Sequence, residues 1–396
     1  MNRPTKRARK VKIKQAVVAG LEADLVALLR TRGSVPRVQL ARELNLAPST
    51  IGIYVDRLIH EGLLSEGSRV AREVGRPATL LTLNPDGGRF AGVDIEARSA
   101  MITVVDFSQK PLEQVSLRLR KSDAVETILQ KVVEAINDLG RNETRPLLGV
   151  GVGVPGTVDV PRGVALHYEH IRGWKDVPLV AWLSEKLNVP VFIENNIRSM
   201  AMAEMWFGAA RGAENFICLG VRSGVGAGIV AQGHLQHGHD NMAGEIGNWL
   251  CPTVLPKPGE RVETSFETLE SLASMSGMSR RLNHRSAGED DWTVEQLVEA
   301  LGRDEQTAGD CVRAAGEACG WVAGQLNLAL NVDLVILAGP FTTFGDAFLG
   351  PMHEAMRCSL PELHSSMPRV ECSQLGPFVG ALGAAALAVQ QWKPVR

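Results

Sequence analysis

The sequence predicts an α/β protein in which a small winged helix-turn-helix module precedes a larger body of two lobes. Residues 20–60 hold three short stretches with apolar side chains at helical spacing. From about residue 88, buried strand-like runs alternate with helical stretches, twice over. The charge also changes there: residues 1–90 contain 16 Lys and Arg against 8 Asp and Glu, whereas the rest contains 26 against 36. A basic module joined to an acidic body indicates that only the first part meets a polyanion.

Composition excludes several classes of protein. The chain has 396 residues, 45% hydrophobic and 22% charged, which is ordinary for a globular protein of two or three domains. No apolar run approaches the roughly 20 residues that span a bilayer, and the basic N-terminus lacks the apolar stretch of a secretory signal. The 6 cysteines contain no C-x-x-C pair and are expected to be reduced thiols. We therefore expect a cytoplasmic protein without a membrane partner.

The module begins with a helix at 20–32 that Gly33 ends. Ser34 is the expected N-cap of a second helix. A short turn then leads to Pro48, which suits the first position of a third helix with apolar residues at i, i+4, i+7 and i+8. Three short helices with a tight turn between the last two are typical of a helix-turn-helix.

Two strand-like runs around a polar connection, residues 63–84, predict the wing. The candidate contacts to double-stranded DNA are Ser49, Thr50, Ile53 and Arg57 on the third helix and Arg69, Arg72 and Arg76 in the wing. On this interpretation Ile53 touches a thymine methyl and Arg57 holds a phosphate. Helix spacing alone also fits a small dimerisation module, but the basic charge and the wing favour DNA. The first 14 residues fit either a solubilising tail or an arm that contacts DNA.

We expect four parts along the chain: a basic tail at 1–18, the winged helix-turn-helix at 19–85, a first lobe at 88–200 with a C-terminal helix at 380–393, and a second lobe at 201–380. A ligand cleft is expected between the lobes. One buried strand, 191–195, ends in polar residues, and the next residue is Asn196. A phosphoryl-transfer enzyme would need a carboxylate base at this place, and an amide cannot accept a proton at neutral pH. The site is therefore predicted to bind without reacting.

Several segments occur in a characteristic order between residues 151 and 389: GVGVPGTVD, VPVFIENN, SGVGAGIV, AGEIGN, ILAGP and ALGAAALAV. With these segments the chain resembles the ROK family of bacterial repressors and sugar kinases. The resemblance implies a two-lobed actin-like ATPase fold with a sugar in the cleft. It extends to the winged helix, which only the repressor branch of the family carries.

The chain departs from the kinases of that family in two places. Their first phosphate loop has an acidic residue and then Gly-Gly-Thr, whereas here Asp94 stands but Glu96, Ala97 and Arg98 replace the small residues. These side chains are expected to fill the space of a phosphate contact, and Glu96 to repel the phosphate. Their E-N-D-A-N motif becomes Glu194-Asn195-Asn196, without the catalytic aspartate. The second loop, 223–228, keeps its glycines, which we interpret as retained architecture. These departures from the kinases imply no catalytic residue, no cofactor and no phosphorylation.

The family's structural zinc is also expected to be missing. Its four ligand positions are occupied here by Asn248, Arg261, Glu263 and Thr268, so no metal is predicted. The sugar-facing residues remain. By resemblance, Glu245 and Glu270 accept hydrogen bonds from sugar hydroxyls and Asn195 supplies an amide contact. The full set of candidate ligand-binding residues is Asn195, Asn196, Glu245, Asn248, Glu270, His170 and Gly156.

Together these features predict a DNA-binding transcriptional regulator, most simply a repressor, whose body binds a sugar or sugar derivative as effector. Paired recognition helices require a homodimer or homotetramer on double-stranded operator DNA. Three alternatives stay open. One is a sugar kinase with an appended DNA-binding module, and another is a DNA-binding protein whose pocket no longer binds a ligand. The third is control by a protein partner that docks on the body.

Overall fold

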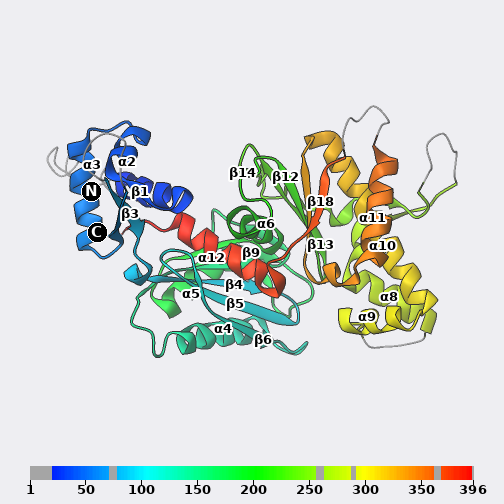
Figure 1. Cartoon of the computed structure of the whole chain (residues 1–396). Helices are drawn as coiled ribbons and strands as arrows, with labels where there is room; N and C mark the ends of the chain where they lie inside the picture. The colour runs from blue at the N-terminus through cyan, green and yellow to red at the C-terminus, as the bar shows by residue number, and fades with distance from the viewer. Residues whose placement is uncertain (1–19, 71–77, 256–262, 287–290, 361–366, 395–396) are drawn as a thin grey trace, which may run out of the picture.

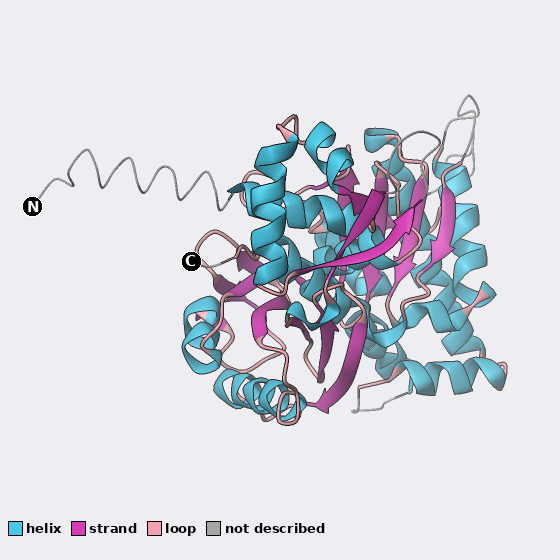
Figure 2. Ribbon diagram, turned by 60° about the vertical axis from the view of Figure 1, so that its left-hand side comes forward, coloured by secondary structure: helices cyan, strands magenta, loops and turns pink. Residues whose placement is uncertain are grey.

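The computed structural model of the chain describes residues 20–70, 78–255, 263–286, 291–360 and 367–394. Three parts follow one another in space: the N-terminal module, a first lobe built on one sheet, and a second lobe built on another (Figure 1). Strands run through the middle of the body, with helices outside them (Figure 2). None of the helices in the described part of the chain is long and apolar enough to cross a membrane.

The N-terminal module contains the predicted helix-turn-helix and wing strands. A helix over residues 20–32 is followed by β1 (Val35–Pro36), α2 (Arg37–Glu43), α3 (Pro48–His60), β2 (Leu64–Val70) and β3 (Ala78–Leu83). The three strands pair in the order β1-β3-β2. Gly33 ends the first helix at a φ of 73°, and Pro48 opens α3, as the sequence predicts. The buried core consists of Leu25, Leu29, Leu40, Ile51, Val55 and Leu58.

The start of the second helix differs from the prediction. Ser34 is not its N-cap, because Val35 pairs with Leu81 in the sheet before the helix begins. Pro36 occupies the N-cap position and makes no side-chain capping hydrogen bond. Its ring fixes φ near the observed −75°, which fits the change from strand to helix without a cap. The sheet of the wing thus includes a short strand, β1, which lies between the first two helices in the chain.

The first lobe is built on a sheet of order β11-β7-β4-β5-β6. Its elements are β4 (Arg89–Ile95), β5 (Ser99–Asp106), β6 (Pro111–Arg118), α4 (Val125–Leu139), β7 (Leu147–Val154), α5 (Leu179–Leu187), β11 (Val191–Asn195) and α6 (Asn196–Phe207). The smaller strands β8 (Thr157–Asp159), β9 (Val164–His167) and β10 (Lys175–Val177) form a separate sheet. In the large sheet β11, β7 and β4 are parallel, so their carboxyl ends lie at one edge.

The C-terminal helix α12 (Val379–Gln391) packs on this first sheet. A Cβ at Gly92 of β4 or at Gly151 of β7 would overlap the backbone of α12. Glycine at both strand positions therefore permits the helix to approach the sheet closely. The last residues of the chain thus belong spatially to the first lobe.

The second lobe is built on a sheet of order β14-β13-β12-β17-β18. The strands are β12 (Phe216–Val221), β13 (Val225–Ala231), β14 (His234–Leu235), β17 (Leu334–Ala338) and β18 (Arg369–Cys372). A hairpin of β15 (Leu250–Pro252) and β16 (Phe266–Thr268) and the turn η2 (Ile246–Asn248) accompany them. The helices are α7 (Leu269–Ala273), α8 (Met275–Ser286), α9 (Val294–Gly302), α10 (Gln306–Leu330) and α11 (Asp346–Ser359).

Helix α6 lies between the lobes and packs against both of them. On one side a Cβ at Gly383 of α12 would overlap Ser199 of α6. On the other side a Cβ at Gly228 of β13 would overlap Ala201. Because α6 begins directly after β11, the polar end of that strand lies at the boundary of the lobes.

Candidate functional site

Asn195 joins the end of β11 to the start of α6. Its side-chain Oδ1 accepts hydrogen bonds from the backbone N–H groups of Ile197 and Arg198, so it caps the helix. Its Nδ2 donates to the carbonyl of Gly156 at 3.1 Å and to Oε1 of Glu245 at 3.4 Å. Three of the predicted ligand-binding residues therefore meet at one point, with the amide of Asn195 held between the lobes.

Glu194 is the centre of a buried ionic cluster beside this point. Its Oε1 accepts from Nε of Arg198 at 2.7 Å, and its Oε2 lies 2.7 Å from Nε2 of His237. Arg198 in turn donates to the carbonyls of Asn241 and Ala243. Burial alone raises the pKa of Glu194, but His237 and Arg198 outweigh it and hold that pKa below its ordinary value. The cluster ties the loop that precedes Glu245 to the start of α6.

The two carboxylates predicted to face the sugar are both half-buried. Burial raises the pKa of Glu245; Arg198 partly offsets this, and the charge of Glu270 adds to it. Burial also raises the pKa of Glu270, which His170 partly offsets. A Cβ at Gly247, two residues after Glu245, would lie 2.8 Å from Oε2 of Glu270, so the two carboxylates belong to one region, and the charge of His170 acts on Glu270. A region with two acceptors of raised pKa suits a neutral ligand rich in hydroxyl groups.

Asn196, Asn248 and His170 differ in their surroundings. Asn196 is buried, and its Nδ2 donates to the carbonyl of Ile95 at 3.4 Å. Asn248 is exposed at the end of η2. His170 lies edge-on to the ring of Tyr168, with ring centroids 5.2 Å apart. For these residues, as for Asn195, Gly156, Glu245 and Glu270, the role in ligand binding stays a prediction.

A buried arginine that the sequence analysis did not single out connects the lobes. Arg222 follows β12 in the second lobe, and its guanidinium donates two hydrogen bonds to Asp94 of the first lobe, at 3.1 and 2.6 Å. Its Nη1 also lies 2.7 Å from Oε1 of Glu96. Burial lowers the pKa of a guanidinium, but Asp94 and Glu96 hold that of Arg222 above its ordinary value. The position of Arg222 directly before the glycine loop 223–228 was the available signal.

The arginine lies where the resemblance expects the phosphate loops. Glu96 was predicted to crowd and repel a phosphate there, and it is instead paired with a cation supplied by the chain. A second link between the lobes lies nearby, where the hydroxyl of Tyr168 is 3.1 Å from Oγ of Ser223. Burial raises the pKa of Tyr168 to about 12. Ser223, the first residue of the loop 223–228, therefore contacts the first lobe, directly after Arg222.

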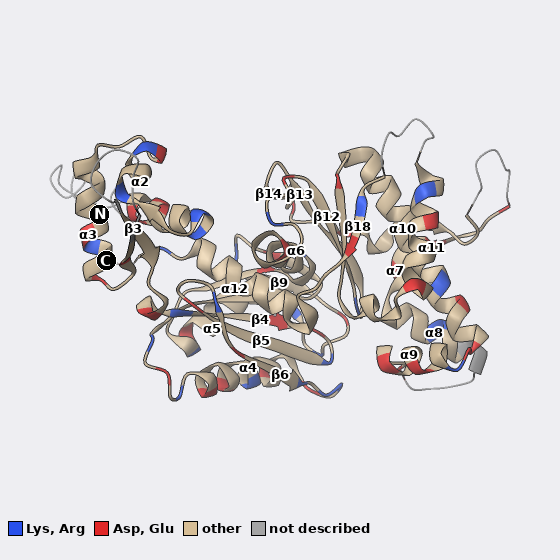
Figure 3. Ribbon diagram, viewed as in Figure 1, with Lys and Arg blue, Asp and Glu red and all other residues tan. Residues whose placement is uncertain are grey.

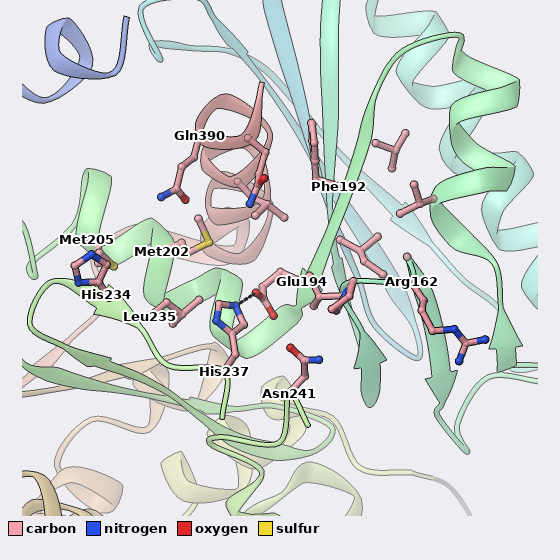
Figure 4. A pocket seen from close by; sticks show the side chains of 18 of the residues that line it. Arg162, Phe192, Glu194, Met202, Met205, His234, Leu235, His237, Asn241 and Gln390 are labelled. Atoms are coloured by element: carbon pink, nitrogen blue, oxygen red, sulfur yellow. Dashed lines mark hydrogen bonds and ion pairs between the residues drawn. The ribbon is translucent and has the colours of Figure 1, made fainter. Parts of the chain in front are cut away.

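A cavity of about 660 Å³ lies next to the ionic cluster. It is walled by β11, α6, the β14 region and the end of α12, and Figure 4 shows His237 reaching Glu194 within it. The wall residues include Glu194, His237 and Asn241 but not Asn195, Glu245 or Glu270. The cavity thus lies next to the predicted sugar-binding region, and the Glu194 cluster lies between the two.

The residues at the family's zinc positions do not suit a metal. Thr268 caps α7 by accepting a hydrogen bond from the backbone N–H of Ser271. Arg261 lies outside the described residues, and Asn248 and Glu263 are exposed. Burial raises the pKa of the nearby Cys251 to about 12, which keeps its thiol protonated. Within the described ranges no group of three or more His, Cys, Asp or Glu side chains is placed to hold a metal ion.

The predicted DNA-reading side chains of α3 differ in their exposure and in their contacts within the module. Ser49 and Ile53 are exposed, Ile53 to 62%, and Thr50 is half-buried. Arg57 donates to the buried carboxylate of Glu22 at 2.8 Å, so part of its guanidinium is already committed within the module. In the wing, Arg72 and Arg76 lie outside the described residues, and the side chain of Arg69 is likewise not described.

The positive charge of the N-terminal region is concentrated before the folded module. Residues 20–70 contain six Arg and six Asp or Glu, whereas residues 1–19 contain seven Lys and Arg and no acidic residue. In Figure 3 the module accordingly shows basic and acidic positions side by side. One such basic position, Arg37, pairs with Asp56 and Glu66. The attraction to a polyanion predicted from charge thus belongs mainly to the segment at 1–19.

The body matches the model of one protein family, ROK, over residues 90–391. The chain belongs to the ROK family. The match begins directly after the module and ends at the last residue of α12, so it covers both lobes. The fold is accordingly the two-lobed, actin-like ATPase fold of ROK sugar kinases, preceded by a helix-turn-helix module.

Regulators and kinases both occur among the relatives of this ROK chain. The DNA-binding transcriptional dual regulator NagC of Escherichia coli is 29% identical over 367 residues, which cover 87% of this chain and 88% of that protein. A glucokinase of Halalkalibacterium halodurans is 28% identical over 324 residues, covering 76% of this chain and 95% of its own. The solved structure of a ROK family transcriptional regulator, a homologue of the E. coli MLC protein, has a TM-score of 0.75 at 21% identity. That likeness covers 94% of this chain and 97% of the other, so the shared fold includes the module.

Proposed function

We propose that this ROK protein is a transcriptional regulator that binds operator DNA and responds to a sugar or sugar derivative without phosphorylating it. The observation that carries the proposal is the Arg222 guanidinium bound to Asp94 and Glu96. It fills the place that a nucleotide phosphate would need and links the lobes there. A helix-turn-helix module precedes this altered body, and the chain matches the DNA-binding regulator NagC over most of its length.

Two further features argue against a kinase. The residue after Asn195 is an amide whose Nδ2 faces the carbonyl of Ile95, so it supplies no general base. Glu96 adds a second carboxylate to the phosphate region, and its pKa is raised by burial while Arg222 opposes that rise. A nucleotide would therefore have to displace a paired, buried cation and then meet two carboxylates.

A sugar remains a suitable ligand for the other side of the cleft. Asn195 and Glu245 form a donor and an acceptor 3.4 Å apart, and Glu270 supplies a second carboxylate. Adjacent hydroxyl groups of a sugar pair well with such acceptors. A ligand that binds between Glu245 of the second lobe and Asn195 of the first would favour one lobe angle over the other.

DNA binding would use α3 together with the basic residues at 1–19. The exposed side chains Ser49 and Ile53 are the best candidates to reach base edges, and the seven Lys and Arg of residues 1–19 would neutralise phosphates. A homodimer would place two such helices on the two halves of an operator, and a homotetramer would pair two dimers.

The proposal is tested by isothermal titration of the protein with a panel of hexoses, pentoses and N-acetylated hexosamines, alongside an assay for ADP. We expect heat of binding from one class of sugar and no ADP when ATP and Mg²⁺ are added. ADP formation that depends on a sugar would contradict the proposal and favour the kinase. No heat with any sugar would instead favour a DNA-binding protein without a sugar effector.

A further inference from the structure

An arginine of the DNA module makes a contact with the body in the described part of the chain. Arg30 lies near the end of the helix at 20–32, and its Nη1 donates to the carbonyl of Val389 in α12 at 2.5 Å. The guanidinium carbon is 5.9 Å from the ring centroid of Phe90 and 5.4 Å from that of Phe107. Trp392 lies edge-on to both rings. In Figure 1 the first helix of the module accordingly lies against the end of α12.

This contact buries a charge that is poorly compensated. The nitrogens Nε and Nη2 of Arg30 are buried without a hydrogen-bond partner. Burial lowers the pKa of Arg30 to about 9, and no carboxylate offsets that effect. The rings and the Val389 carbonyl offer weaker compensation than water would offer to a free guanidinium. Docking of the module therefore gains apolar contact and loses hydration of a cation.

The helix that carries Arg30 also reaches the candidate recognition helix. Glu22, on the same helix, binds Arg57 of α3 through an ion pair of 2.8 Å. On the body side, α12 packs against α6, whose first turn is capped by Asn195. The Arg30 contact is thus located between the candidate effector site and the DNA-reading helix.

We infer that Arg30 makes the joint between module and body releasable. In the docked state its guanidinium is buried with two nitrogens, Nε and Nη2, that have no hydrogen-bond partner, and in the released state water solvates it. Because these opposing terms hold the two states close in free energy, a change in the body can shift the population between them. The part of this inference that concerns the effector rests on the proposed function, whereas the part that concerns docking does not.

The test compares Arg30→Met with the wild type by hydrogen exchange in the full-length protein. Methionine keeps an unbranched apolar side chain between Phe90 and Phe107 and removes the charge. We expect about tenfold slower exchange in peptides covering 20–32 and 386–394, since removal of an unpaired buried cation stabilises the docked state. Arg32→Met is the matched control, because Arg32 is on the same helix with its side chain 60% exposed, and we expect no change.

The variant is then measured for its effector response. We expect Arg30→Met to bind operator DNA and sugar but to lose most of the sugar-induced change in operator affinity. Faster or unchanged exchange in Arg30→Met would overturn the inference, since it would mean that the charge strengthens the joint or plays no part. If Arg30→Met does not fold, hydrogen exchange is measured on Arg30→Gln, which is also neutral and tests the inference in the same way. If no sugar changes the operator affinity of the wild type, the proposed function fails while the exchange result still decides the docking part.

Discussion

Arg222 of the second lobe donates two hydrogen bonds to Asp94 of the first, at 3.1 and 2.6 Å, in an environment where both side chains are almost completely buried. A bidentate pair of this kind is geometrically specific. It is located at the point where the fold resembles a nucleotide site, so the lobes are held together there by the chain itself. The region of Asn195 and Glu245 is where we expect a ligand to act on the lobes.

Arg222→Ala should destabilise the protein strongly. Loss of the guanidinium leaves Asp94 buried and unpaired next to Glu96, and breaking a buried pair in this way costs about 3–5 kcal/mol. Urea unfolding followed by circular dichroism measures the loss. Arg281→Ala, which removes the partly exposed pair with Glu267, is the control and should change stability by about 1 kcal/mol or less. A loss below about 1 kcal/mol for Arg222→Ala would show that the pair does not hold the lobes together.

Asn196→Asp should not create a kinase. The substitution restores a carboxylate at the position of the missing base, but Arg222 and Glu96 still fill the phosphate region. We expect no sugar-dependent ADP formation in a coupled assay with ATP and Mg²⁺. If this single variant released ADP above the wild-type background, then Arg222 would not be what prevents nucleotide binding.

Glu245→Gln should weaken sugar binding by about 1.5–3 kcal/mol, the usual contribution of a hydrogen bond to a charged group. The amide keeps the shape of the side chain and removes its charge, so the fold should be retained. Isothermal titration with the effector measures the change, and Glu214→Gln, at an exposed position, serves as the control. Equal affinities for Glu245→Gln and the wild type would remove Glu245 from the ligand site.

Sugar binding should weaken in mildly acidic solution. Burial raises the pKa of both Glu245 and Glu270, so each becomes protonated at a higher pH than an ordinary glutamate of about 4.3. The raised pKa values affect folding with the opposite sign. They stabilise the folded state at pH values below the ordinary pKa of glutamate, and this stabilisation is lost as the pH rises through the raised pKa. Affinity measured from about pH 8 down to about pH 5 should fall, and Glu245→Gln should flatten the curve. A pH-independent affinity would contradict this assignment.

Ile53→Ala should reduce operator affinity without affecting stability. Ile53 is 62% exposed on α3, so truncating it should change the free energy of unfolding by at most about 0.5 kcal/mol. Loss of an apolar contact to a base should weaken specific binding, by no more than the roughly 1–3 kcal/mol that a bidentate base contact contributes, and leave nonspecific binding unchanged. Arg57→Ala is a less clean test, because it also removes the ion pair with the buried carboxylate of Glu22. Unchanged operator affinity in Ile53→Ala would place base reading elsewhere.

The sequence predicted the order of elements well because each is marked by local signals. Pro48 opens α3, and the apolar run at 191–193 leads to Asn195, which caps α6. Both signals come from residues that are close together in the chain. Local propensity favours Ser34 as a helix cap. The pairing of Val35 with Leu81, which depends on the wing, outweighs that propensity. Long-range pairing of this kind leaves no local signal.

The candidate site was predicted only in part for the same reason. Asn195, Gly156 and Glu245, which the resemblance assigns to one ligand site, lie within hydrogen-bond distance, and their role in binding stays a prediction. The partnership of Arg222 with Asp94 spans 128 positions in the chain, and nothing near Arg222 identifies its partner. The contact between Arg30 and Val389 joins two parts that the sequence presents as separate modules.

The most direct test of the account is fluorescence anisotropy of the full-length protein on labelled DNA from upstream of its own gene, with and without each sugar of the panel. We expect tight, salt-sensitive binding to this DNA, with an affinity that one class of sugar changes. Glu245→Gln should bind the same DNA without that response to sugar. Tight binding that no sugar alters would contradict sugar control, and no specific binding would contradict the assignment as a regulator.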